Sequence, residues 1–162
     1  PNMLEFYKGT VIPDLMFRIF GKYFSLQKFD LCQKAIEILL YFSSPTENCW
    51  GKIQFDRNSF YLYIAQNLTN ILKLQLSDEN VLLSISRLVF KFSTIVQINQ
   101  FLQTSIAENF FMVVQEISQV TFSNIYAYKE PCMFFLRFWS HISNTSKTFP
   151  LNLDNFPAAA TF

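Results

Sequence analysis

The side chains that could do chemistry in this chain are a few basic residues, because the usual catalytic combinations are missing from its sequence. His141 is the only histidine, so a Ser-His-Asp triad and a zinc site built on two histidines are both excluded. The three glycines, Gly9, Gly21 and Gly51, are isolated and form no phosphate-binding loop. The sequence therefore predicts a protein that is not an enzyme, with no catalytic residue, no cofactor and no metal.

Five basic residues have a spacing that suits binding to another protein. They are Lys34, Arg87, Lys91, Arg137 and His141. Arg87 and Lys91 are four residues apart, as are Arg137 and His141, so each couple projects from one side of a helix. If these helices line the concave wall of a solenoid, the residues form a basic strip that favours an acidic protein partner. The alternative interpretation is an ordinary solvated helix surface.

Composition indicates long helices and argues against several classes of partner. Hydrophobic residues make up 51% of the 162 residues, with 20 Phe but only 3 Gly and 6 Pro. A net charge of +1 without a Lys/Arg cluster argues against nucleic-acid binding. No apolar run approaches the roughly 18 residues of a membrane span, so no membrane is expected as partner. Cys32, Cys49 and Cys132 are odd in number and far apart, which favours a reducing compartment.

Apolar residues recur at helical spacing in six segments, and caps or prolines mark several of their ends. The expected helices cover about 13–24, 28–43, 56–76, 78–100, 105–121 and 130–142. Ser77 or Asp78 is expected to cap the fourth, and Ser105 with Glu108 to form a capping box on the fifth. Residues 1–12 are a lead-in, 13–145 carry the helix pairs, and 146–162 are predicted to be an extended tail.

The helices alternate in a way that indicates a repeat. The first, third and fifth are expected to start near Pro13, Asp56 and Ser105, with steps of 43 and 49 residues. The other three start at longer steps of 50 and 53 residues, which fit the period of HEAT repeats only if loop insertions are assumed. HEAT repeats have a period of roughly 40–47 residues, and each pair needs a neighbour to cover its apolar face. We therefore predict an all-α superhelix of about three stacked antiparallel HEAT-type helix pairs. A six-helix bundle around one lipid-binding or catalytic cavity is the alternative.

The order of these segments resembles the importin-β superfamily of nuclear transport receptors, nearest to its exportin 7 (Ran-binding protein 16) branch, with the exportin 4 branch close to it. The resemblance runs from about Thr10 to His141 and rests on order and spacing. Five stretches carry it: Val11–Phe20, Leu31–Ile36, Ser86–Val89, Ser118–Phe122 and Phe134–Trp139. The loop at 44–55 and the Asn-rich tail depart from the family pattern.

The resemblance implies a fragment of a HEAT-repeat receptor that carries protein cargo through nuclear pores. Such receptors bind the GTP-loaded form of the GTPase Ran, contact nucleoporins and move between cytoplasm and nucleus. The direction of transport stays open, and no residue of a Ran-binding motif is matched in this chain. Another HEAT or armadillo scaffold without Ran dependence is the alternative.

Overall fold

Helical apolar stripes and scarce helix breakers produce helices throughout the part of the chain that the structure describes. The structure is a computed structural model, and it describes residues 11–42 and 57–148. Within these ranges there is no strand. The helices are α2 (Val11–Ser25), α3 (Phe29–Phe42), α5 (Arg57–Leu72), α6 (Glu79–Ile95), α7 (Ile98–Phe101), α8 (Ala107–Ser123) and α9 (Lys129–Thr148).

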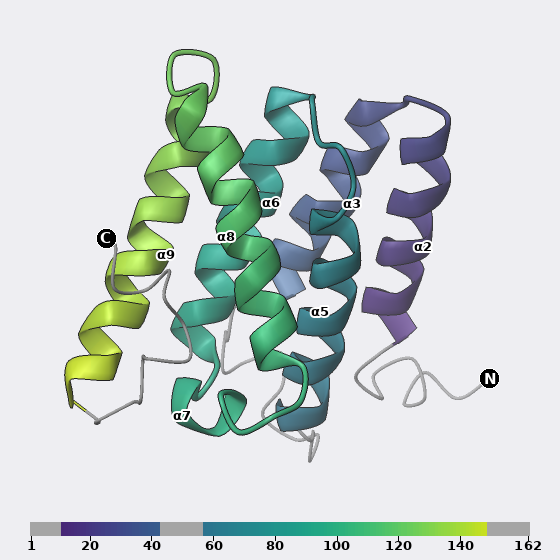
Figure 1. The fold of residues 1–162 in the computed structure, drawn as a ribbon. Helices are drawn as coiled ribbons and strands as arrows, with labels where there is room; N and C mark the ends of the chain where they lie inside the picture. The colour runs from purple at the N-terminus through teal and green to yellow at the C-terminus, as the bar shows by residue number, and fades with distance from the viewer. Residues whose placement is uncertain (1–10, 43–56, 149–162) are drawn as a thin grey trace.

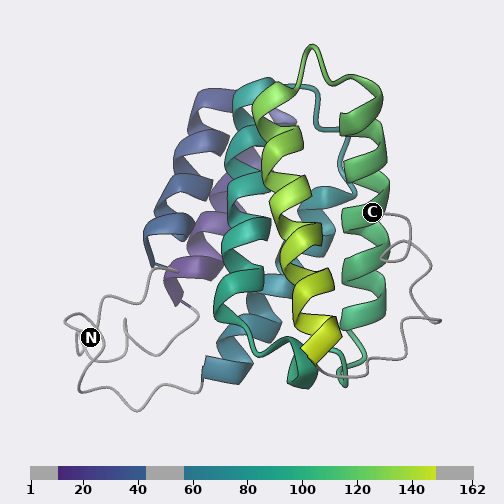
Figure 2. The ribbon, with the colours of Figure 1, turned by 90° about the vertical axis from the view of Figure 1, so that its left-hand side faces the viewer.

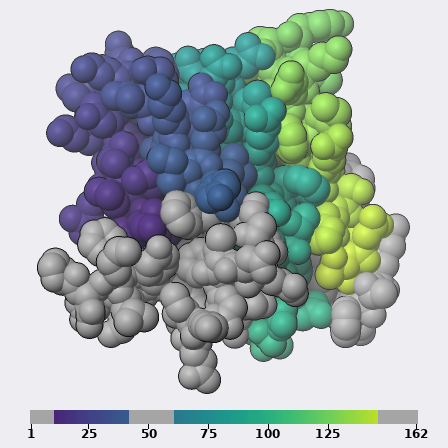
Figure 3. All heavy atoms as spheres, turned by 180° about the vertical axis from the view of Figure 1, so that it is seen from behind, coloured from purple at the N-terminus to yellow at the C-terminus, as the bar shows by residue number. Residues whose placement is uncertain are grey.

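The long helices form three antiparallel pairs in two layers (Figure 1). The pairs are α2 with α3, α5 with α6, and α8 with α9, and their hairpin turns all lie at the upper end in that view. Helices α2, α5 and α8 make one layer, while α3, α6 and α9 make the other, which Figure 3 shows from behind. Figure 2 shows the α8–α9 pair at one end of the stack. The predicted all-α stack of helix pairs is confirmed.

The two layers are packed unequally. Helix α6 packs closely along both α3 and α9, whereas α2 touches α5 at few positions and α5 packs more loosely on α8. Small residues explain the close approach of α6, because Ser84, Ser86 and Ser93 are all fully buried. The hydroxyls of Ser86 and Ser93 donate to the carbonyls of Leu83 and Phe90 in the same helix, at 2.8 and 2.7 Å. Their polarity is therefore satisfied without a partner from another helix.

The repeat is most regular in the second helix of each pair. Helices α3, α6 and α9 start at Phe29, Glu79 and Lys129, which are 50 residues apart each time. Helices α2, α5 and α8 start 46 and then 50 residues apart. The first helices were expected to fit the HEAT period better, and of the four observed steps only their 46-residue step lies within it. The observed spacing is slightly longer than that of ordinary HEAT repeats.

A buried cysteine occupies the same place in the first and third pairs. Cys32 and Cys132 are each the fourth residue of the second helix of their pair. Their thiols lie 3.6 Å from the carbonyl oxygen of Phe20 and 3.4 Å from that of Thr121, each on the first helix of the same pair. The first and third pairs thus share a buried cysteine that contacts the preceding helix.

Aromatic rings fill the core between the second and third pairs. Phe110 of α8 is fully buried, and its ring centroid lies 5.1 Å from Phe92, 5.5 Å from Phe101 and 6.4 Å from Phe138. These rings come from α6, α7, α8 and α9. Edge-on and tilted ring pairs of this kind add to the free energy of burial. One side chain thus ties four helices together.

Two expectations about helix ends are wrong. The fourth helix does not continue to Gln100, because Val96 has extended backbone angles, and the short helix α7 then turns Ile98 and Phe101 into the core. The capping box of Ser105 and Glu108 does not form. Helix α8 starts at Ala107 instead, and the residue before it, Ile106, makes no side-chain cap bond.

The other boundaries move by only a few residues. The first helix starts at Val11, inside the expected lead-in, and α5 ends at Leu72 rather than Leu76. Asp78 caps α6 as expected, since its side chain accepts a 2.9 Å hydrogen bond from the backbone N–H of Val81. Helix α9 runs to Thr148, so 146–148 are helical rather than part of an extended tail. The loop at 44–55 and residues 149–162 lie outside the described residues.

The turn between α2 and α3 places a glutamine where most proteins use glycine. Gln27 has a φ of 56°, in the left-handed region. The backbone N–H groups of Gln27 and Lys28 donate to the carbonyls of Phe24 and Tyr23, both at 3.0 Å, which is the hydrogen-bond pattern of a Schellman motif. A side chain in this conformation is strained, and glycine is not.

Replacing Gln27 by glycine is therefore expected to stabilise the protein by about 0.5–1 kcal/mol, even though it also loosens the unfolded chain. Urea denaturation followed by circular dichroism measures the change. The matched control is Gln66→Gly, at an exposed position inside α5, which should destabilise by about 1 kcal/mol. Destabilisation by both variants would contradict the strain at Gln27.

None of the described helices combines the length and the hydropathy needed to cross a membrane.

Candidate functional site

The five predicted binding residues all belong to one layer of the structure. Lys34 is on α3, Arg87 and Lys91 are on α6, and Arg137 and His141 are on α9. The side chains of Lys34, Arg87 and Arg137 are exposed, and those of Lys91 and His141 are half-buried. The three helices lie side by side in the order α3, α6, α9 (Figure 3), so the residues spread across this layer.

The structure brings two of the five residues together, one on α6 and one on α9. Arg87 and Arg137 both lie over the ring of Phe134, each with its guanidinium carbon 5.4 Å from the ring centroid. The ring of Phe90 on α6 lies 6.2 Å from that of Phe134. We call Arg87, Phe90, Glu130, Phe134 and Arg137 the arginine ledge.

The arginine ledge carries a net positive charge. Arg87 has a carboxylate partner in Glu130, at 3.7 Å, and both side chains are well exposed, at 43% and 59%. An exposed ion pair of this length contributes about 0–1 kcal/mol to stability. Among the described residues, neither Arg137 nor Lys91 has a carboxylate within ion-pair distance. Within the described residues, one of the two guanidinium charges of the ledge is therefore not paired with a carboxylate.

Sequence reasoning found the arginines but missed the residues that hold them. Phe134, which is half-buried with its ring under two cations, and Glu130, the ion-pair partner of Arg87, were not among the predicted residues. Phe134 lies three residues before Arg137 and four after Glu130, so helical spacing was a signal for this cluster. No contact places Lys34 or His141 in the ledge, so the structure does not gather the whole predicted strip into one site.

The described cysteines are poorly suited to react as nucleophiles. Burial, and to a lesser degree the charges of Asp30 and Asp78, raise the pKa of the Cys32 thiol. Burial also raises the pKa of the Cys132 thiol. A raised pKa lowers the fraction of reactive thiolate at neutral pH. Cys49 lies outside the described residues.

Two other kinds of ligand site, a metal site and a cleft, have weaker support in the structure. No cluster of three or more His, Cys, Asp or Glu side chains within 11–42 and 57–148 could hold a metal ion. A half-open cleft of about 200 Å³ lies between α5 and the segment around α7. Its lining is Tyr61, Leu62, Val96, Gln97, Gln100, Phe101 and Thr104, which brings no charged side chain to a ligand.

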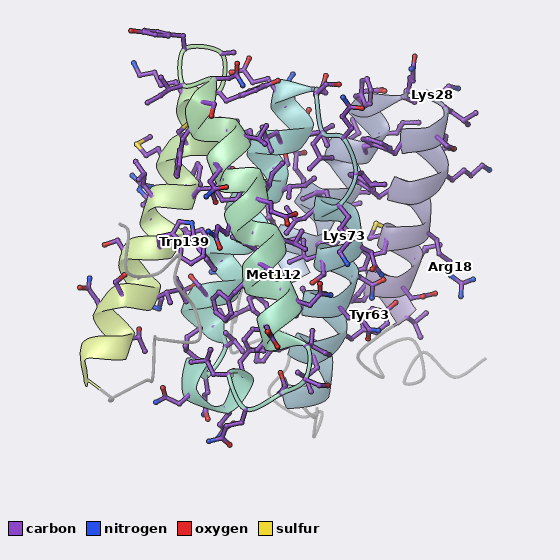
Figure 4. All side chains as sticks on the ribbon, in the orientation of Figure 1. Arg18, Lys28, Tyr63, Lys73, Met112 and Trp139 are labelled. Carbon is purple, nitrogen blue, oxygen red and sulfur yellow. The ribbon has the colours of Figure 1, made fainter. Side chains whose placement is uncertain are left out.

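A polar cluster joins the first two pairs in the layer opposite the ledge, and Figure 4 labels Arg18 and Tyr63, two of its members. The hydroxyl of Tyr63 donates a 2.8 Å hydrogen bond to Asp14, whose other carboxylate oxygen lies 2.7 Å from Arg18. Desolvation, together with the hydrogen bond to Asp14 and the charge of Asp14, raises the pKa of Tyr63 to about 12. This cluster links α2 to α5, where the layer is otherwise loosely packed.

The raised pKa predicts a pH dependence of stability. The fold favours the protonated phenol, so the contribution of Tyr63 is fully present below pH 10 and is lost as the pH rises towards 12. Tyr63→Phe should cost about 1.5 kcal/mol at neutral pH, because a hydrogen bond to a charged acceptor is removed. The stability difference between wild type and Tyr63→Phe should then shrink between pH 10 and 12. Urea midpoints across this range measure it.

The control for the pH experiment is Tyr126→Phe, because Tyr126 is fully exposed in the loop between α8 and α9. Its stability should follow that of the wild type at every pH. A difference between wild type and Tyr63→Phe that stays constant from pH 9 to pH 12 would contradict the assigned role of Tyr63.

No protein-family model, curated protein or solved structure matches this chain.

Proposed function

We propose that this chain is a protein-binding segment of a helical-repeat scaffold. The observation that carries the proposal is the arginine ledge on the α3/α6/α9 layer, where two arginines without strong carboxylate partners lie on a half-buried aromatic ring. Stacked helix pairs present long continuous surfaces of this kind to other proteins. The layered arrangement also supports a scaffold over a bundle built around a lipid or catalytic cavity.

The more specific proposal is a segment of a nuclear transport receptor, exportin-like, that acts in the Ran-GTP-dependent transport of protein cargo between cytoplasm and nucleus. Its support is the order and spacing of the sequence segments that carry the resemblance. The helix pairs of the structure follow one another along the chain in the order that those segments predicted. In this proposal the α3/α6/α9 layer contacts Ran, cargo or nucleoporins, and the surrounding protein supplies the rest of the transport cycle.

The test is binding to Ran in its two nucleotide states. The protein is immobilised and exposed to Ran loaded with either a non-hydrolysable GTP analogue or GDP. Clear preference for the GTP-loaded form, lost in the Arg87→Gln/Arg137→Gln double variant, is the expected result. Equal and negligible binding of both forms would overturn the transport proposal. A scaffold without Ran dependence, the second candidate, would then be the remaining function of this class.

A further inference from the structure

The two arginines of the ledge rest on the same aromatic ring. Both guanidinium carbons lie 5.4 Å from the centroid of one ring, Phe134, so they can be separated by no more than twice that distance. An arginine that rests on an aromatic ring loses less rotamer freedom when it binds a ligand. The ring therefore acts as a platform that fixes two positive charges at a short spacing.

We propose that the arginine ledge binds an acidic peptide segment of a protein partner, whose carboxylates take Arg137 and displace Glu130 from Arg87. This inference rests on the proposed protein-binding function and names the chemistry of the partner. Planar guanidinium groups can pair with carboxylates through two parallel hydrogen bonds, which a lysine cannot do. Arginine is thus the residue type best suited to such a segment.

Glu130 competes only weakly with a partner carboxylate for Arg87. Its oxygen lies 3.7 Å from the Arg87 nitrogen, well beyond the roughly 2.7–2.9 Å of a strong charge-assisted hydrogen bond. Both side chains are largely in water, where their attraction is screened. A partner carboxylate placed at hydrogen-bond distance from Arg87 would make the stronger pair, so exchange of Glu130 is favourable.

The geometry also constrains the spacing of the acidic residues. In an extended peptide, side chains two residues apart point to the same side and are separated by about 7 Å. This separation fits within the limit that the shared ring sets on the two guanidinium carbons. Lys91 lies one turn along α6 from Arg87. The expected ligand therefore carries acidic residues at every second position, a spacing that oligoglutamate also supplies.

The experiment measures binding of a fluorescein-labelled oligoglutamate peptide by fluorescence anisotropy at low salt. Arg87→Gln and Arg137→Gln should each weaken binding by about tenfold, the usual effect of losing one charge-assisted pair. Glu130→Gln should strengthen binding several-fold, because the internal competitor is gone. Lys73→Gln is the matched control, since it removes an exposed positive charge at the end of α5, outside the ledge layer, where Figure 4 labels it. It should leave binding unchanged.

A fourth variant, Phe134→Leu, tests the platform itself. It keeps an apolar side chain but removes the ring, and it should weaken peptide binding several-fold while both arginines remain. Circular dichroism and thermal unfolding check that the variant is folded, and the exposed Met133→Leu on the same helix is a control for the substitution.

Three results would overturn the inference. One is equal binding by Arg87→Gln, Arg137→Gln and Lys73→Gln, and another is weaker binding by Glu130→Gln. The third is displacement of the peptide by inorganic phosphate at equal total charge, which would indicate a simple anion site. If the unaltered protein binds GTP-loaded Ran but not the peptide, this inference alone is rejected. If it binds the peptide but not Ran, only the transport proposal is rejected.

Discussion

Replacing Phe110 by alanine is expected to lower the free energy of unfolding by about 3–5 kcal/mol. The side chain is fully buried, and its ring contacts aromatic rings from α6, α7 and α9. Truncation therefore leaves a cavity among rigid rings that cannot collapse easily to fill it. Because the lost contacts join the last two pairs, α8 and α9 should also separate from the rest of the stack at lower denaturant concentration.

Urea denaturation followed by circular dichroism measures the loss at Phe110, and hydrogen exchange locates it along the chain. The matched control is Met112→Ala on the same helix, because Met112 is 52% exposed and its truncation should change stability by less than about 0.5 kcal/mol. Similar effects at the two positions would show that the aromatic core is not organised around Phe110.

Introducing leucine at Ser86 should destabilise the protein by about 1–3 kcal/mol through overpacking. Ser86 is completely buried on α6, the helix that packs closely on both α3 and α9. A larger side chain would push α6 away from a neighbour or force an unfavourable rotamer. The change should also lower the affinity of the ledge for its ligand, because Arg87 is the next residue along α6.

The control at this position is Ser86→Ala. Its hydroxyl donates only to the carbonyl of Leu83 in its own helix, so removing it should alter stability by less than about 0.5 kcal/mol. If alanine and leucine are equally harmful, the hydroxyl rather than the small size of Ser86 is what the packing requires. Thermal unfolding of the two variants beside the wild type decides between these results.

Periodicity predicted most of the fold because the helices bury one face each. Residues such as Ile85, Leu88, Val89 and Phe92 recur at helical spacing and are all buried. The break after Ile95 could not be predicted, because neither glycine nor proline marks it. It follows from tertiary packing, since burial of Ile98 and Phe101 requires the chain to change direction. The capping box predicted at Ser105 and Glu108 was wrong for the same reason: tertiary packing, and not the local sequence pattern, determines where α8 begins.

The candidate site was only partly predictable. Spacing within one helix identified Arg87 with Lys91, and Arg137 with His141, as couples. The contact that organises the ledge joins Arg87 of α6 to Phe134 and Glu130 of α9, more than 40 residues away along the chain. Such a contact depends on which helices are neighbours and on their relative rotation, and a single sequence does not specify either. The resemblance to nuclear transport receptors stays a prediction.

The unequal packing of the two layers has a mechanical consequence. Bending is expected where neighbouring helices make few contacts, between α2 and α5 and between α5 and α6, whereas the closely packed helices α3, α6 and α9 should keep their spacing. The helices α2, α5 and α8 should therefore move apart and together more easily than α3, α6 and α9, which carry the arginine ledge. A partner bound across α6 and α9 would then stay bound while the curvature of the stack of helix pairs changes.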